Sequence, residues 1–403
     1  MINEVLPIDG WKSCGIDIIP QGCVVKYKFG DPVFLHCPHD RQPGPTIHRR
    51  YTVKVRDLPL GIHRSTLEVE VLECWCPKCR CFHSVRPGAL LGTKGMTWRL
   101  MWHISWLVKE GSVADVARSL GIPAKTVSRA NKAVLEVIDF LTPVKLDNLD
   151  AIVVDEKYLG RKRKFVTCVV DGYTGELLWM AEGKGSASLD GFYAMLTEDE
   201  LEDIKVVSVD RGNAYVKAVR EHLPHAELSF DPLHVIKNIN DAVTEVRRDQ
   251  YAKAEKEHKG IIKGMRYALL KAPGNLLGRQ CPRLETLLAM NAPINTACVL
   301  KEQAREMYKL YYLSDAVPAL QEWLELARQS GLKPFQRLAK GMARDAGYIL
   351  NYFRYKLTSG RIEGVNSVIA RVLPKTRGVG SVDYLRLMLR LHLNRLMNLL
   401  LFC

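Results

Sequence analysis

The order of apolar runs between residues 150 and 235 is the feature that most constrains the fold of this chain. AIVVDEKYLG, FVTCVV and ELLWMA are three short runs, and DGYTG separates the last two. Asp-Gly and Thr-Gly between apolar runs are typical of hairpin turns, so we predict three consecutive antiparallel strands. Helical spacing in SLDGFYAMLTEDELEDI and AYVKAVREHL alternates with the strand-like runs IKVVSVD and ELSFD.

Three antiparallel strands followed by helix, strand, helix, strand is the element order of the RNase H-like fold. This order places two acids, Asp155 and Asp210, at the ends of neighbouring strands, and Asp231 ends the last strand. An aspartate at a strand end is usually a turn or cap residue. Asp171 is such a case, because Gly172 follows it in a hairpin turn. Position alone therefore does not assign a function to these acids.

A third acid follows later, in the segment SGRIEGVNSVIARVL. Apolar Ile362, Val365, Ile369 and Val372 mark the buried face of a helix, which leaves Glu363 and Asn366 on an adjacent polar face. Eight Lys or Arg residues lie between residues 354 and 390, against only Glu363 and Asp383. A carboxylate in so basic a segment suits a metal site that faces phosphates. Three converging carboxylates suit Mg²⁺ or Mn²⁺, and two such ions roughly 3.5–4 Å apart can cleave and join phosphodiesters.

The motifs VDEKYLGRKRKF, SVDRGNAY, SFDPLHVIKNIN and SGRIEGVNSVIARVLPKTRGVG resemble those of the DDE transposases of bacterial insertion sequences, specifically the ISL-three group. The resemblance covers nearly the whole chain. It implies that Asp155, Asp210 and Glu363 are the catalytic, magnesium-binding acids, and that residues of roughly 240–350 form a helical insertion. Asp231-Pro-Leu-His234 matches an Asp-x-x-His signature of related groups. His234 is then either a catalytic residue or a structural histidine near the sheet end. Ser359 stands where the family has Asn.

A helix-turn-helix is indicated by SVADVARSLGIPAKTVSRANK, residues 112–132. Gly121 supplies the turn, Pro123 begins the second helix, and Val127 faces the core. The side chains left for a DNA major groove are Lys125, Ser128, Arg129 and Lys132. An ordinary helical hairpin is the alternative.

The cysteines indicate a zinc site. Four of the eleven lie between Cys74 and Cys81, and Cys76-Pro-Lys-Cys79 has the spacing of a zinc half-site. Cys37 is expected in the other half, but Asp40 stands three residues on, where the resembling family usually has a second Cys. The remaining ligand candidates are His39, Asp40, Cys74 and Cys81. The alternative is a zinc-free β module with spare thiols.

The net charge of +14 and the pI near 9.2 favour a polyanionic partner, and DNA is the expected one. Arg161, Lys162, Arg163 and Lys164 follow the Asp155 strand, and we expect phosphate contacts there. The basic segment around Glu363 adds Arg371, Lys375 and Arg377. Neither a signal peptide nor an apolar run of about 20 residues is present, so we expect a cytoplasmic protein that associates with the nucleoid when bound to DNA and uses no membrane.

We therefore predict a multidomain α/β protein. Its parts are a zinc-ribbon-like β module (1–92), a helix-turn-helix domain (93–148), an RNase H-like core (149–240 and 351–403) and an all-helical insertion (241–350). The predicted function is a transposase that binds the terminal inverted repeats of its element, as a homodimer on paired ends, and transfers them to target DNA. A transposase-derived DNA-binding regulator and an RNase H-like nuclease without strand transfer are the alternatives.

Overall fold

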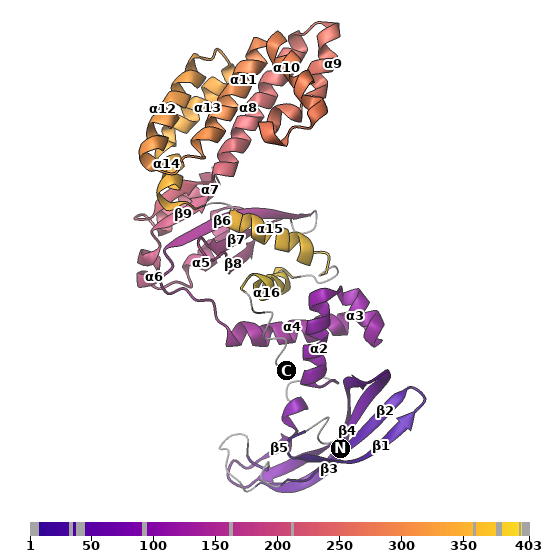
Figure 1. Ribbon diagram of the computed structural model, residues 1–403. Coiled ribbons are helices and arrows are strands. Elements are labelled where there is room, and N and C mark those ends of the chain that lie inside the picture. Colours follow the sequence, from indigo (N-terminus) through magenta and orange to yellow (C-terminus); the bar gives the residue numbers. More distant parts are fainter. Residues whose placement is uncertain are drawn as a thin grey trace. The chain divides into compact units, whose positions relative to one another are not determined.

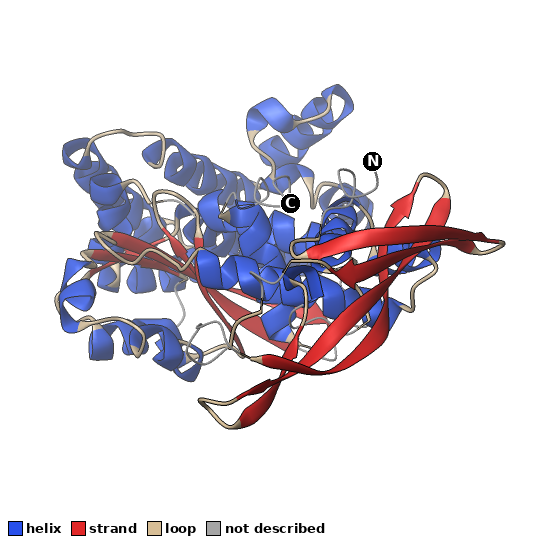
Figure 2. Cartoon of the chain, turned by 90° about the horizontal axis from the view of Figure 1, so that it is seen from below, coloured by secondary structure: helices blue, strands red, loops and turns tan. Residues whose placement is uncertain are grey.

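The computed structural model describes residues 8–31, 35–37, 45–90, 95–160, 164–210, 213–357, 360–375, 381–394 and 396. The chain divides into two compact units, Met1–Pro143 with Arg371–Cys403, and Val144–Ala370 (Figure 1). The strands form two separate five-stranded sheets, and most other elements are helices (Figure 2). Within the described residues, none of the helices has the length and apolarity needed to cross a bilayer.

The N-terminal sheet is built from alternating apolar and polar residues, as in STLEVEVLE. Along its longest central strand the alternate residues Leu67, Val69 and Val71 are fully buried, which is the period of a half-buried strand. The strand order is β1-β2-β4-β3, with β5 paired to β4. The strands are β1 (Trp11–Ile19), β2 (Gly22–Phe29), β3 (Thr46–Leu60), β4 (His63–Cys76) and β5 (Cys81–Val85).

Three helices follow this sheet: α2 (Trp98–Glu110), α3 (Val113–Leu120) and α4 (Ala124–Leu141). Gly121 ends α3 in the left-handed conformation, with φ 57°, which a glycine adopts without strain. Val127 is fully buried, as predicted. Pro123 differs slightly from the prediction: its ψ of 136° makes it the N-cap, and the helix begins at Ala124.

The second sheet has the strand order β10-β9-β6-β7-β8. The first three strands along the chain pair antiparallel, and the last two pair parallel to β6 and to each other. The three consecutive antiparallel strands predicted from the hairpin signals are confirmed, and the strands that carry Asp155 and Asp210 are neighbours, as predicted. The strands are β6 (Ala151–Gly160), β7 (Lys164–Asp171), β8 (Leu177–Glu182), β9 (Val206–Val209) and β10 (Glu227–Phe230).

Two local details of this region differ from the prediction. β6 does not end at Asp155 but continues to Gly160, because its pairing with β7 goes on after its pairing with β9 stops at Val154. The helix predicted after β8 is divided into α5 (Asp190–Tyr193) and α6 (Glu198–Asp203), because Thr197 and Glu200 form a capping box that starts a new helix. α7 (Asn213–His222) joins β9 to β10.

Helices dominate after β10, and the longest ones lie side by side in a bundle (Figure 1). α8 begins at Pro232, directly after the sheet and earlier than the predicted boundary at 241, because Asp231 caps it and Pro232 is its first residue. α14 packs against β10 at the other end of this region. The α-helices are α8 (Pro232–Lys253), α9 (Lys256–Gly264), α10 (Cys281–Met290), α11 (Ala292–Met307), α12 (Leu313–Gln329), α13 (Lys333–Arg344) and α14 (Ala346–Tyr355).

The C-terminal helices do not stay together in the core as the predicted domain 351–403 implies. α15 (Gly360–Val372) reaches the second sheet, whereas α16 (Val382–Leu393) belongs to the N-terminal unit and packs on α4. Buried polar contacts hold α16 there. Asn131 donates to the Tyr384 hydroxyl, and Arg390 pairs with Asp139.

Candidate active site and metal centre

Strand register brings Asp155 and Asp210 together. Val154 of β6 pairs with Val209 of β9 in a parallel ladder, and each aspartate comes directly after its valine. Side chains at the same level of adjacent parallel strands are neighbours, so the two carboxylates converge where the pairing of β6 with β9 ends. Phe230 of β10 pairs with Val209 as well, which puts Asp231 at the same level on the next strand.

Asp231 and His234 organise the start of α8. The buried Asp231 side chain caps the helix by accepting a hydrogen bond from the His234 backbone N–H at 3.3 Å. The His234 imidazole then reaches the second catalytic candidate, with Nε2 2.6 Å from Asp210 Oδ1 and 3.9 Å from Asp231 Oδ2. The hydrogen bond to Asp210 raises the pKa of the His234 imidazole above its usual value, and burial opposes this.

Asp155 is held from two sides. One oxygen accepts a hydrogen bond from the Glu156 backbone N–H at 2.7 Å, and the other accepts one from the Asn366 side chain at 3.0 Å. Burial raises the pKa of the Asp155 carboxyl, and the Asn366 hydrogen bond opposes that rise by favouring the charged form. Asn366 lies on α15, so this bond holds α15 against the middle of β6.

The donor set fits a divalent cation. One ligand atom from each of Asp155, Asp210 and His234 lies within 4.8 Å of the other two. Two carboxylates provide the hard oxygen ligands that Mg²⁺ and Mn²⁺ take, and few protein ligands suit an ion that keeps water and substrate phosphate.

Glu363 is not part of this three-residue group. Its side chain is exposed on α15, three residues before Asn366. Residues three apart on a helix have Cβ atoms about 5–6 Å apart, so Glu363 is one turn away from the side chain that contacts Asp155. The apolar face predicted for this helix is buried at Val365, Ile369 and Val372. Ser359 and the Ile362 side chain lie outside the described residues.

The four side chains of α4 that were predicted to contact DNA differ in their accessibility. Lys125 and Arg129 are exposed on α4, and Ser128 is half-buried. Lys132 does not point freely outward, because its ammonium pairs with Asp383 of α16 at 3.1 Å and with Glu136 at 3.4 Å.

Of the basic residues near the catalytic segments, one is exposed, one is engaged in a contact within the protein, and the others lie outside the described residues. Arg371 is exposed near the end of α15. Lys375 donates to the backbone carbonyls of Lys109 and Glu110 at the end of α2, which assigns it a capping contact in place of the predicted DNA contact. Arg161, Lys162, Arg163, the side chain of Lys164, and Arg377 lie outside the described residues.

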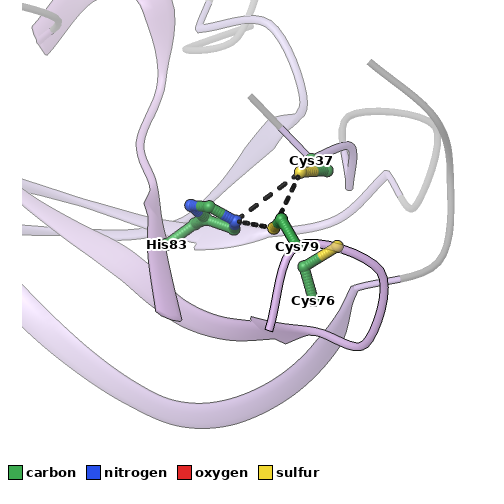
Figure 3. A group of neighbouring side chains, drawn as sticks. All are labelled: Cys37, Cys76, Cys79 and His83. Atoms are coloured by element: carbon green, nitrogen blue, oxygen red, sulfur yellow. Dashed lines mark hydrogen bonds between the residues drawn. The ribbon is translucent and has the colours of Figure 1, made fainter. Parts of the chain in front are cut away.

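The cysteine candidates gather at one end of the N-terminal sheet, where Cys76 ends β4 and the turn to β5 carries Cys79. Figure 3 shows Cys37, Cys76, Cys79 and His83 facing one another. Cys37 Sγ lies 3.5 Å from both Cys79 Sγ and His83 Nε2, and the latter two are 3.0 Å apart. A tetrahedral zinc with bonds of about 2.3 Å to sulfur requires ligand separations of about 3.8 Å, close to these values. The Cys79 backbone N–H lowers the pKa of the Cys76 thiol, which favours the thiolate that binds metal.

His83 is the residue that the sequence reasoning missed. Of the candidates for the fourth ligand, Cys74 and Cys81 are not in the four-residue group, although Cys81 Sγ is 3.3 Å from Cys79 Sγ. His39 and Asp40 lie outside the described residues. A signal was available in the spacing Cys79-x-x-x-His83. His83 lies two residues after the start of β5, close to the turn that carries Cys79.

Comparison with known proteins identifies the family of this chain. A family model of ISL3-type DDE transposases, described as "Transposase", matches residues 152–389, which include both aspartates, His234 and Glu363. The transposase for insertion sequence element IS1001 of Bordetella parapertussis is 28% identical over 391 residues, covering 95% of this chain and 96% of the relative. The transposase for insertion sequence element IS1557 of Mycobacterium tuberculosis is 27% identical over 301 residues, covering 68% and 67%. On the match of the family model to more than half of its length, the chain belongs to the ISL3 family of DDE transposases.

Proposed function

We propose that this transposase binds the terminal inverted repeats of its own insertion sequence, cleaves the DNA there and joins the freed 3′ hydroxyl to target DNA. The observation that carries the proposal is the convergence of Asp155 and Asp210 where the pairing of β6 with β9 ends, with α15 bonded to Asp155 through Asn366. In this proposal the second sheet and α15 are an RNase H-like core, and α8–α14 are its helical insertion.

The proposed ligands of catalytic Mg²⁺ or Mn²⁺ are Asp155, Asp210 and Glu363. Support for Glu363 comes from its place one turn before Asn366 and from the family resemblance. When bound, the divalent ions supply a lowered pKa for the attacking water and charge stabilisation at the leaving oxygen. The chain contributes the placement of the carboxylates, which strand register and two hydrogen bonds to Asp155 fix before substrate arrives.

His234 is proposed to orient Asp210. Its Nε2 contacts Oδ1 of that carboxylate at 2.6 Å, so the other oxygen stays available to a cation. Asp231 holds the first turn of α8, from which the imidazole projects. This makes the Asp-x-x-His segment a support for the second catalytic aspartate.

The experiment that tests the proposed activity uses duplex DNA that carries the inverted repeat flanking the gene, labelled at one strand end. We expect cleavage at the repeat boundary in Mg²⁺ or Mn²⁺, and intact DNA when a chelator removes the cation. Cleavage that persists in chelator, or cleavage at random positions only, contradicts the proposal.

DNA recognition is proposed for α3 and α4, with α4 in the major groove. Lys125, Ser128 and Arg129 are the side chains that α4 offers, since Lys132 is tied to Asp383. The second copy expected on paired ends and the association with the nucleoid are part of the same proposal. The zinc site is proposed to hold the N-terminal sheet as a zinc-ribbon-like module, with Cys37, Cys76, Cys79 and His83 as ligands.

Arg129→Ala is expected to weaken binding to the inverted repeat by about 1–3 kcal/mol more than binding to random DNA, because a guanidinium contacts a base edge in two places. Electrophoretic mobility or anisotropy titrations measure both affinities. Arg129→Lys is the matched control, because it keeps the charge and loses the two-pronged geometry. It should retain the affinity for random DNA and lose the preference for the repeat. Equal weakening on both DNAs means that Arg129 touches phosphate only.

A further inference from the structure

A cavity of about 710 Å³ opens beside the carboxylates, within the unit formed by Val144–Ala370. Asp210 and His234 line one end of it, α8 and α13 line much of the rest, and Glu156, Lys184, Gly185 and Tyr215 complete the lining. The proposed chemistry uses only the carboxylate end. The walls that the helical insertion contributes have no role in holding the cations, so they need a separate explanation.

One face of α8 leads away from the catalytic candidates. Residues 234, 238, 241 and 245 follow each other at intervals of three or four, and all line the cavity. At 1.5 Å per residue this face runs about 16 Å along the helix from His234. Asn238 and the exposed Asp241 lie midway along it, and neither makes a side-chain hydrogen bond or ion pair within the described part of the chain.

Positively charged side chains line the same cavity. Lys184 and Lys237 line it and form no salt bridge with any described residue, and Lys184 lies 4.6 Å from the Phe165 ring centre. Arg337 projects from α13 and uses one of its N–H groups on Glu245, at 2.6 Å. α13 contains no acidic residue, and its exposed Lys340 is outside the cavity lining. The cavity therefore offers both cations for phosphates and unpaired amide and carboxylate groups.

The volume of the cavity fits single-stranded DNA better than a duplex. Its volume is within the range of about 300–1,000 Å³ that small-molecule pockets have, which accommodates a few nucleotides of one strand. The major groove alone of a B-form duplex is about 12 Å wide, so a whole duplex is far too broad for such a site. Unpaired bases expose their Watson–Crick edges, which amide and carboxylate side chains can read.

We propose that the cleft between α8 and α13 binds unpaired nucleotides of the DNA strand next to the scissile phosphate. Lys184, Lys237 and Arg337 contact phosphates, and Asn238 and Asp241 contact base edges. The inference rests on the proposed function, because it takes the carboxylates to be the place where a DNA strand is cut. It gives the helical insertion a direct role in holding substrate.

The test measures binding of two fluorescein-labelled DNA probes in Ca²⁺ by anisotropy, a blunt duplex and the same duplex with a short single-stranded 3′ extension. We expect wild type to bind the extended probe more tightly. In the double variant Lys237→Ala/Arg337→Ala the salt slope for the extended probe should fall by about 1.4, because each single-strand phosphate contact contributes about 0.7. The slope for the blunt probe should not change.

Lys340→Ala is the matched control, since it removes a cation from the same helix outside the cleft. It should leave both slopes unchanged. Equal affinity of wild type for the two probes overturns the inference, as does an equal loss on both probes in the double variant. These outcomes differ from failure of the proposed function, in which wild type keeps its preference for the extension but cleaves no DNA in Mg²⁺.

The base contacts are tested with extensions of cytidine or thymidine only. A carboxylate accepts a hydrogen bond from the cytosine amino group, whereas the one donor of unpaired thymine, its N3–H, lies between two carbonyl oxygens that repel a carboxylate. We expect wild type to bind the cytidine extension about fivefold more tightly or better, because a good base contact contributes about 1–3 kcal/mol to the discrimination between bases. Asp241→Ala should remove the preference. A preference that survives in this variant, or none in wild type, removes Asp241 from the base contacts.

Discussion

Asp155→Asn and Asp210→Asn are each expected to abolish DNA cleavage and joining, with a loss of several orders of magnitude in rate. Asp210 directly follows β9, Asp155 directly follows the part of β6 that pairs with β9, and each directs its carboxylate to the shared site. An amide keeps the shape of the side chain but removes the negative charge that holds a divalent cation, so the metal is lost or displaced. Single-turnover assays on labelled inverted-repeat DNA measure the loss, and circular dichroism checks that each variant is folded.

Glu363→Gln is expected to have the same effect, although Glu363 is one turn away from the residue that contacts Asp155. Asp171→Asn is the matched control. Asp171 also ends a strand of the same sheet, but it accepts hydrogen bonds from the Tyr173 and Thr174 backbones in a turn, which an Asn can continue to do. It should remain active. Joining by Glu363→Gln at the wild-type rate removes Glu363 from the metal site.

Cys76→Ser is expected to release zinc and unfold the N-terminal sheet. Purified wild type should contain about one zinc per chain, because four ligand atoms within 4.8 Å of one another form a closed site. In zinc-finger peptides the binding of structural zinc contributes about 10–16 kcal/mol that becomes folding free energy, so losing one ligand is severe. Elemental analysis and proteolysis of the N-terminal region measure the outcome. Binding to the inverted repeat should weaken, while joining of pre-cut ends survives in part.

Two further variants identify the fourth ligand. His83→Ala should lose zinc as Cys76→Ser does, whereas Cys81→Ser should keep it, because Cys81 is near Cys79 but outside the four-residue group. Cys14→Ser is the control for removing an exposed thiol elsewhere in the sheet. Wild type that carries no zinc and resists proteolysis in chelator shows that the thiols have no metal role.

The order of strands and helices along the chain in the region of the second sheet could be predicted because its signals are local. Hairpin turns, short apolar runs and the switch to helical spacing each depend on a few neighbouring residues, and together they give the order of elements along the chain. That order also predicts that Asp155 and Asp210 are close, because residues that end adjacent parallel strands share an edge of the sheet.

What could not be predicted depends on contacts between distant residues. His83 faces Cys37 across 46 positions, and its spacing from Cys79 does not by itself distinguish a metal-binding histidine from a polar residue in an alternating strand. The apolar face of α16 does not by itself identify the surface that it covers. Its attachment to α4 depends on the pairs Asn131–Tyr384 and Asp139–Arg390, more than 240 residues apart. The same docking explains why Lys132, outward by helical period, pairs with Asp383.

The most direct test of the central claim is a strand-transfer assay on wild type and Asp210→Asn together. A short duplex with the inverted repeat and a free 3′ hydroxyl is incubated with a supercoiled plasmid in Mg²⁺. We expect wild type to join the labelled end covalently to the plasmid, and Asp210→Asn to bind the end with nearly unchanged affinity and form no joined product. A wild type that only nicks the plasmid is a nuclease, and one that only binds the end is a regulator. Either result, or joining by Asp210→Asn at the wild-type rate, contradicts the account.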